Sequence, residues 1–290
     1  MADEIANILA ELRRLNALLE ARLPAPPEPI GLPEGVAFRW QGKNCPRPFQ
    51  VIESPKPVQL DDLIGIDHQK QTLDRNTRQF LSGYPANNVL LWGSRGTGKS
   101  SLIRALLHAY GSQGLRIIEV SRANLKDLPV IQSALRGRTE HFIVYCDDLA
   151  FEADDQDYKA LKAILEGSLE GQPENLLIYA TSNRRHLLPE HHQDNQAARW
   201  VNDELHQAES VEEKLSLSER FGIWLSFIPF TQDQYLAIVA YWLGRLGNLA
   251  LSEQARTEAL AYALLRGSRS GRVARQFAMD FAGRQQLETT

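Results

Sequence analysis

The amino-acid sequence predicts an α/β fold in which a doubly wound parallel sheet of five strands is followed by a small all-helical domain. The first observation is that short apolar runs alternate with helical stretches over residues 61–230, a pattern typical of parallel strands joined by crossover helices. The second is that only helical patterns follow, over residues 231–290. The third is a glycine-rich segment, Gly93–Ser100, between an apolar run and a helical stretch. We therefore expect an α/β domain followed by a helical one.

Five apolar runs are short enough to be strands that are buried on both faces. Helical stretches such as residues 100–110 and 158–166 separate them. Three further helices are predicted at residues 232–246, 252–265 and 271–281. The predicted strands are Asn88–Trp92, Leu115–Val120, Phe142–Cys146, Leu176–Thr181 and Ile223–Ile228.

The first 60 residues divide into two segments. Residues 1–23 predict an amphipathic helix, because apolar side chains three and four residues apart fall on one stripe. The stripe either packs on its own domain or docks on a partner. Residues 24–60 form a proline-rich linker and an irregular segment that could include short strands, since proline removes the backbone N–H that helices and sheets use. The stripe consists of Ile5, Ile8, Leu12, Leu15 and Leu19.

The composition is that of a globular protein. Of 290 residues, 43% are hydrophobic and 23% charged, which disfavours disorder as the general state. The net charge of −4 gives no global electrostatic reason for binding nucleic acid. No apolar run approaches the ~18 residues that cross a membrane, and acidic Asp3 and Glu4 stand where a secretory signal would be basic. Only two cysteines are present, which suits a reducing compartment. We therefore expect a cytoplasmic protein without a membrane span.

The glycine-rich segment matches the pattern G-x-x-x-x-G-K-[ST] of a P-loop. Its glycines let successive backbone N–H groups turn inward around phosphates, at the positive end of the following helix. Lys99 is expected to reach the β- and γ-phosphates of ATP, and the Ser100 hydroxyl to ligate Mg²⁺. The nucleotide-binding residues predicted here are Gly93, Ser94, Arg95, Gly96, Thr97, Gly98, Lys99, Ser100 and Ser101.

Polar residues at the ends of two later strands supply the remaining chemistry. Asp147 and Asp148 follow the strand Phe142–Cys146; Asp147 is expected to hold Mg²⁺, directly or through water, and Asp148 to orient the attacking water. Glu152 lies one helical turn further on and is the alternative to Asp148, because its side chain is longer. Asn183 ends the next strand and is positioned to hydrogen-bond the γ-phosphate or the water.

Several segments together resemble the AAA-type ATPases, a branch of the P-loop NTPases. The resemblance implies that Ile64 and Gly65 pack on adenine and that Asn183 is the residue known as sensor 1. It also implies that Arg220 is an arginine finger, which reaches the ATP of a neighbouring subunit. The segments are Asp62–Gly65, Gly96–Lys99, Thr181–Asn183, Ser218–Gly222 and Ser270–Phe277.

The last of these segments resembles sensor 2, an arginine of the helical lid domain that touches the γ-phosphate. It offers two candidates, Arg272 and Arg275. Alignment of Ser270-Gly271-Arg272 with the Gly-x-Arg pattern of unfoldase-type members favours Arg272.

More narrowly, the chain resembles a bacterial family of AAA-type ATP-binding proteins, domain-of-unknown-function family 815, from about residue 45 to residue 283. The strings that carry this resemblance are Leu90–Gly93, Tyr179–Leu187 and Ser216–Gly222. The resemblance implies a fold and a nucleotide but no physiological substrate. The superfamily usually has Asp-Glu where this chain has Asp147-Asp148; the shorter side chain requires the water to sit closer and implies slow turnover.

Two classes of function fit these features. The first is an ATPase that assembles head to tail as a homo-oligomer when ATP is bound and remodels or switches an unidentified protein partner. The alternative is an ATP-dependent binding module like the helicase and transposase loaders, which also carry Asp-Asp and act on a nucleic-acid-associated partner. The arginines of residues 266–284 could meet nucleic acid, but interleaved aromatic residues for base stacking are missing there, apart from Phe277 and Phe281 on the predicted core stripe. The lid and sensor residues argue against a small-molecule kinase, and residues 121–126 lack the aromatic of a protein-threading pore.

Overall fold

The computed structural model describes residues 11, 13–14, 30–53, 55, 57–151, 161–162, 165, 171, 173–183 and 220–289. The chain divides into two compact units, residues 1–32 and 33–290, and every element named below belongs to the second unit. The domain limits predicted within that unit stay predictions. The apolar stripe of residues 5–19, the prolines of residues 24–29, Glu152 and most of the helical stretch 158–166 lie outside the described residues.

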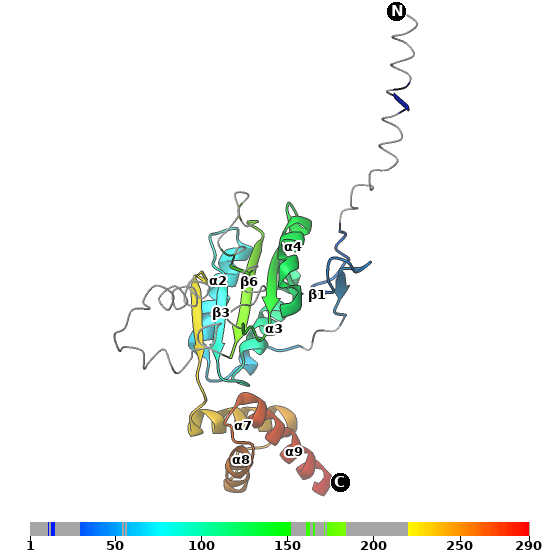
Figure 1. Ribbon diagram of the computed structural model, residues 1–290. Helices are drawn as coiled ribbons and strands as arrows, with labels where there is room; N and C mark the ends of the chain where they lie inside the picture. The colour runs from blue at the N-terminus through cyan, green and yellow to red at the C-terminus, as the bar shows by residue number, and fades with distance from the viewer. Residues whose placement is uncertain are drawn as a thin grey trace, which may run out of the picture. The chain divides into compact units, whose positions relative to one another are not determined.

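The sheet has seven strands in the order β2-β1-β4-β5-β6-β3-β7, and all neighbours except β1 and β2 run parallel (Figure 1). The five predicted strands are present, and the parallel sheet followed by helices is confirmed. The count of five was too low, because two short strands from residues 24–60, a segment predicted to be irregular or to include short strands, extend the sheet. The strands are β1 (Ala37–Trp40), β2 (Phe49–Val51), β3 (Val89–Gly93), β4 (Leu115–Glu119), β5 (His141–Cys146), β6 (Leu176–Ser182) and β7 (Ile223–Phe227).

The middle of the sheet is buried on both faces. Every residue of β6 is buried, and so are five of the six residues of β5. A strand with helices on both faces has no solvent side, so it needs a continuous apolar sequence. The polar exceptions, Thr181 and Ser182, come only at the carboxyl end of β6. Polar side chains of β6 are therefore found at the edge of the sheet where the parallel strands end.

Helices join the strands and then follow them. Within the α/β part these are α2 (Asp67–Leu81), α3 (Lys99–Tyr110) and α4 (Leu128–Leu135), and after the last strand come α7 (Gln232–Gly247), α8 (Glu253–Leu265) and α9 (Gly271–Thr289). The last three gather at the carboxyl end of the strands (Figure 1). No helix in the described part of the chain is both long and apolar enough to traverse a bilayer.

The ends of the last three helices follow local sequence signals. Thr231 caps α7 in a capping box with Gln234, and the Ser252 hydroxyl caps α8. Helix α9 runs to Thr289, beyond the predicted end at Phe281. Its last turns have little apolar pattern but are held by Arg284, which pairs with Glu258 of α8.

A buried carboxylate ties the hairpin of β1 and β2 to the rest of the sheet. Asp127, which is 2% exposed, accepts hydrogen bonds at Oδ2 from Trp40 Nε1 and from the backbone N–H of Lys43, each 3.0 Å long. Its other oxygen, Oδ1, has no hydrogen-bond partner among the described residues. A buried carboxylate is costly unless it is hydrogen-bonded, so each of these two donors is important for stability.

We predict that Trp40→Phe lowers the free energy of unfolding by about 2 kcal/mol or more, because it removes one of the two donors to a buried charge. Asp127→Asn removes that charge. The Trp40→Phe/Asp127→Asn double variant should therefore lose less free energy of unfolding than the sum of the losses in the two single variants. Urea denaturation of the four proteins checks this, and additive effects would show that the Trp40–Asp127 bond does not stabilise the hairpin.

Candidate functional site

The glycine-rich loop turns sharply between β3 and α3. Gly93 has φ 125°, and a side chain there would overlap the carbonyl oxygen of Phe227 in the adjacent strand β7. Gly96 has φ 77°, and a Cβ there would lie 2.9 Å from Ser270 Oγ. The backbone N–H of Ser94 donates to Phe227 O over 2.9 Å. Only glycine allows this loop to lie so close to its neighbours with a left-handed backbone.

Lys99, the first residue of α3, lies folded over the loop. Its Nζ donates to the carbonyl oxygens of Gly93 and Ser94 over 2.7 and 2.8 Å and to Asn183 Oδ1 over 3.3 Å. Burial lowers the pKa of the Lys99 ammonium below its ordinary value, and the nearby carboxylates, Asp148 above all, offset part of that effect. A cation is thus held at the mouth of the loop.

Asp147 connects the ends of β5 and β6 with α3. Its Oδ1 accepts hydrogen bonds from Thr181 Oγ1 over 2.6 Å and from Ser100 Oγ over 2.9 Å. Burial alone would raise the pKa of the Asp147 carboxyl, but the hydrogen bonds from Thr181 and Ser100 oppose it. Contact with the Tyr145 hydroxyl and the charge of Arg104 act in the same direction, and the net pKa is lowered. Asp147 is therefore held as a carboxylate.

Asp148 adopts the left-handed backbone conformation, with φ 54°. Its N–H donates to Thr181 Oγ1 over 2.9 Å, and its Oδ1 accepts a hydrogen bond from Asn183 Nδ2. Arg95 of the loop lies 3.5 Å from Oδ2. Asp148 and Asn183, predicted from separate strands, are thus in direct contact.

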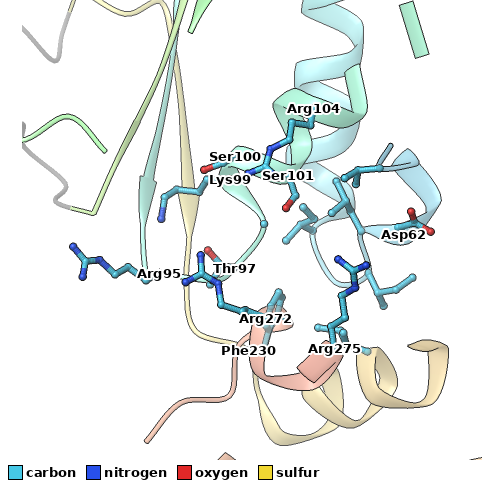
Figure 2. A pocket seen from close by; sticks show the side chains of 18 of the residues that line it. Asp62, Arg95, Thr97, Lys99, Ser100, Ser101, Arg104, Phe230, Arg272 and Arg275 are labelled. Atoms are coloured by element: carbon cyan, nitrogen blue, oxygen red, sulfur yellow. The ribbon is translucent and has the colours of Figure 1, made fainter. Parts of the chain in front are cut away.

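These groups line a cavity of about 740 Å³. Its walls are the glycine-rich loop, the segment before α2, the carboxyl ends of β5 and β6, and helices α7 and α9 (Figure 2). The predicted residues that line it are Ile64, Arg95, Gly96, Thr97, Gly98, Lys99, Ser100, Ser101, Asp147, Asp148, Asn183 and Arg272. Gly65, Gly93, Ser94 and Arg220 are not among its lining residues.

The start of α9 is attached to the loop. The Arg272 N–H donates to Gly96 O over 3.4 Å, and the Ser270 hydroxyl accepts from the backbone N–H of Val273. In Figure 2 the Arg272 side chain extends toward Thr97, whereas Arg275 lies on the Asp62 side of the cavity.

Arg275 has a different neighbour. Its guanidinium lies over the ring of Trp242 of α7, 4.7 Å from the ring centroid. The two candidate arginines thus lie at different ends of the cavity, and only Arg272 is next to the loop.

Arg104 and Trp242 are among the lining residues that sequence reasoning missed. Arg104 could have been found, because it follows Ser100 by one turn of α3 and so shares its helix face. Trp242 could not, because its position depends on how α7 meets the segment before α2.

The lining suits a polyanion with a divalent ion. Among the described lining residues there are five cations, against the three carboxylates of Asp62, Asp147 and Asp148. Ser100 and Asp147 present hard oxygen ligands of the kind that Mg²⁺ prefers. The cations are Arg95, Lys99, Arg104, Arg272 and Arg275. The residues present therefore fit a nucleoside triphosphate bound with Mg²⁺.

Arg220 lies at the other end of the sheet. It precedes β7 by three residues, and β7 pairs with β3 so that Ile223 is opposite Val89 and Phe227 opposite Gly93. Four residues of strand span about 13 Å. Arg220 therefore precedes the end of β7 that lies beside the start of β3, and the glycine-rich loop follows the other end of β3.

Comparisons with solved structures show what the fold is. One mutant of RuvB from Thermotoga maritima has 16% identity and a TM-score of 0.55, over 82% of this chain and 69% of that one. Orc1 from Aeropyrum pernix, in complex with DNA, has 16% identity and a TM-score of 0.52, over 81% and 63%. The FIGL-1 AAA domain, in complex with ADP, has 17% identity and a TM-score of 0.50, over 78% and 73%.

These likenesses establish an AAA-type P-loop ATPase fold. The chain spans less than two thirds of some of these proteins, such as 64% of a second mutant of T. maritima RuvB. No curated protein is similar to the chain in sequence. The model of the family described as "Protein of unknown function (DUF815)" matches residues 33–285. The chain therefore belongs to this family.

Proposed function

We propose that the protein is an ATPase that binds ATP with Mg²⁺ in the cavity and hydrolyses it. The observation that carries the proposal is the convergence of five side chains at the loop and at the ends of β5 and β6. Together with Thr181, which links Asp147 to Asp148, they form one connected hydrogen-bonded group. The five are Lys99, Ser100, Asp147, Asp148 and Asn183.

The binding roles follow from the donors and acceptors present. Lys99 exchanges its carbonyl partners for the β- and γ-phosphates, which are better partners for a buried ammonium. Ser100 and Asp147 hold Mg²⁺, which supplies charge neutralisation at the phosphates when it is bound. The adenine lies toward Ile64 and Trp242, two apolar residues that line the cavity.

The hydrolytic roles rest on Asp148 and Asn183. Asp148 orients the attacking water, and Asn183 fixes the direction of its carboxylate through their hydrogen bond. Arg272 contacts the γ-phosphate from the lid, which is supported by its attachment to Gly96. A change at the phosphates is thereby passed to α9.

Arg220 acts in a neighbouring chain. Because it is not among the residues that line the cavity of its own chain, its role requires a head-to-tail homo-oligomer in which it completes the next subunit's site. We propose that the cycle of assembly and hydrolysis remodels or switches a protein partner. The alternative, a loader-like module on a nucleic-acid-associated partner, shares the same site and is supported by the Asp147-Asp148 pair.

The ATPase proposal predicts different failures for the two ends of the site. Lys99→Ala should weaken ATP binding by about 100-fold or more, because it removes charge-assisted bonds to two phosphates. Asp148→Asn should keep ATP bound and lower turnover by about 10²-fold or more, because only the water loses its acceptor. Calorimetry and phosphate release separate the effects. Equal loss of binding in both variants would contradict these roles.

The shared-site proposal predicts complementation. Arg220→Ala should bind ATP normally yet lose about 10³-fold in turnover. A mixture of the Arg220→Ala and Lys99→Ala variants should regain activity. At some interfaces, the intact loop of an Arg220→Ala chain then meets the intact Arg220 of a Lys99→Ala chain. Phosphate release from the mixture is the measurement. If Arg220→Ala alone turns over like the natural chain, Arg220 is not a finger.

The assignment of sensor 2 predicts a contrast between two neighbouring arginines. Arg272→Ala should lower the affinity for ATP by about 10-fold or more and leave the affinity for ADP unchanged, since it removes a contact to the γ-phosphate. Arg275→Ala should lower the affinities for ATP and ADP equally, because the Arg275 side chain lies over Trp242, away from the loop that would hold the phosphates. Calorimetry is carried out with both variants in an Asp148→Asn background, which prevents hydrolysis during the titration. The reverse pattern would make Arg275 the sensor.

The choice of partner is tested by capture with the ATP-bound Asp148→Asn form. Recovery of a remodelled protein free of nucleic acid favours the first function. Recovery of a helicase or another nucleic-acid-associated protein favours the loader-like function.

A further inference from the structure

Tyr145 lies in β5 directly beneath the predicted magnesium ligands. It is 7% exposed and precedes Asp147 by two residues, so both side chains are on the same face of the sheet. Ser100, at the start of α3, donates to Asp147 Oδ1 over 2.9 Å, and Ser100 and Arg104, one helical turn apart, both oppose the rise in the pKa of the buried Tyr145 hydroxyl. The phenol is thus enclosed between its own strand and the helix that follows the loop.

The hydroxyl of Tyr145 is buried and has no hydrogen bond of normal geometry among the described residues. It nonetheless lies close to both Asp147 and Ser100: it helps to lower the pKa of the Asp147 carboxyl, and Ser100 opposes part of the rise that burial causes in the pKa of the Tyr145 hydroxyl. However, Asp147 Oδ1 already accepts from Ser100 and Thr181. Buried hydroxyl groups almost always have a partner, and leaving one without a partner destabilises the fold. A physical reason is therefore needed for this one.

A second tyrosine shows that the fold can satisfy such a group. Tyr179 of β6 is opposite Tyr145 in the sheet register and is also buried. Its hydroxyl is 3.0 Å from Asn76 Nδ2 and 3.0 Å from Thr77 Oγ1, both on α2. The two tyrosines differ in one respect: Tyr179 faces structural partners, and Tyr145 faces the residues that hold Mg²⁺.

We propose that Tyr145 is a positioning residue of the magnesium site, an inference that rests on the ATPase function proposed above. When Mg²⁺ is bound, Ser100 uses its oxygen as a ligand, and Asp147 needs another buried donor to keep its carboxylate in place. Tyr145 donates that hydrogen bond. The hydroxyl is unsatisfied in the nucleotide-free protein and satisfied in the loaded one, so metal binding gains what the free fold lacks.

The test compares Tyr145→Phe with Tyr179→Phe, the same chemical change at two facing positions. Mn²⁺ replaces Mg²⁺, and electron paramagnetic resonance measures its affinity with saturating ADP. Tyr145→Phe should lower the affinity for Mn²⁺ by about 10-fold or more, as is typical for residues that support a metal ligand. Tyr179→Phe should leave that affinity unchanged. Affinity for ADP in EDTA should be unchanged in Tyr145→Phe.

Thermal unfolding without nucleotide supplies the second measurement. Tyr145→Phe should raise Tm by about 2–4 °C, because it removes an unsatisfied buried hydroxyl. Tyr179→Phe should lower Tm, since it leaves the side chains of Asn76 and Thr77 with fewer partners.

Each outcome has one meaning. Unchanged Mn²⁺ affinity in Tyr145→Phe would overturn this inference alone. An equal loss of ADP affinity in EDTA would also overturn it, because the hydroxyl would then act through the loop. A lower Tm for Tyr145→Phe would mean that the hydroxyl has a partner in the resting protein, and would overturn it too. If the natural chain binds neither ADP nor Mn²⁺, the ATPase proposal fails with it.

Discussion

The interaction on which the site depends is the pair of hydrogen bonds from Ser100 and Thr181 to one oxygen of Asp147. Ser100 belongs to α3, Thr181 to β6, and Asp147 follows β5, so the pair joins three elements at one atom. A buried carboxylate without such donors would be protonated or would destabilise the fold. Because the same hydroxyls that stabilise the charge are at the cavity wall, folding and the proposed metal binding would use one set of groups.

The glycine-rich loop is also in close contact with the start of helix α9. Gly96 has no side chain, which lets Ser270 and the first turn of α9 approach the loop closely. Any shift of the loop around a bound phosphate therefore acts directly on the start of a long helix. Trp242 of α7 lies beneath Arg275 of that helix, so the two lid helices meet again at the far end of the cavity. A nucleotide that fills the cavity contacts both attachments at once.

The sequence predicted the parts of this structure that are encoded locally. The loop Gly93–Ser100 and the acidic pair after β5 were identifiable because each follows an apolar run, and parallel strands end at one edge. The bounds of strands β1 and β2 and their place in the sheet were not identified, since these strands have only four and three residues and are held by pairing with distant segments and by Asp127. The choice between Arg272 and Arg275 likewise needed the position of α9, because both lie near the start of the same predicted helix.

The tyrosine pair shows what lies beyond sequence patterns. In the sequence Tyr145 and Tyr179 are equivalent, each an aromatic residue within a buried strand. What separates them is which helix covers each ring: α2 brings an asparagine and a threonine to Tyr179, whereas the start of α3 brings the residues of the loop to Tyr145. Local rules of polar satisfaction are most often broken at functional sites. An unsatisfied hydroxyl on the residue two positions before Asp147 is therefore better explained by what the site binds than by imperfect packing.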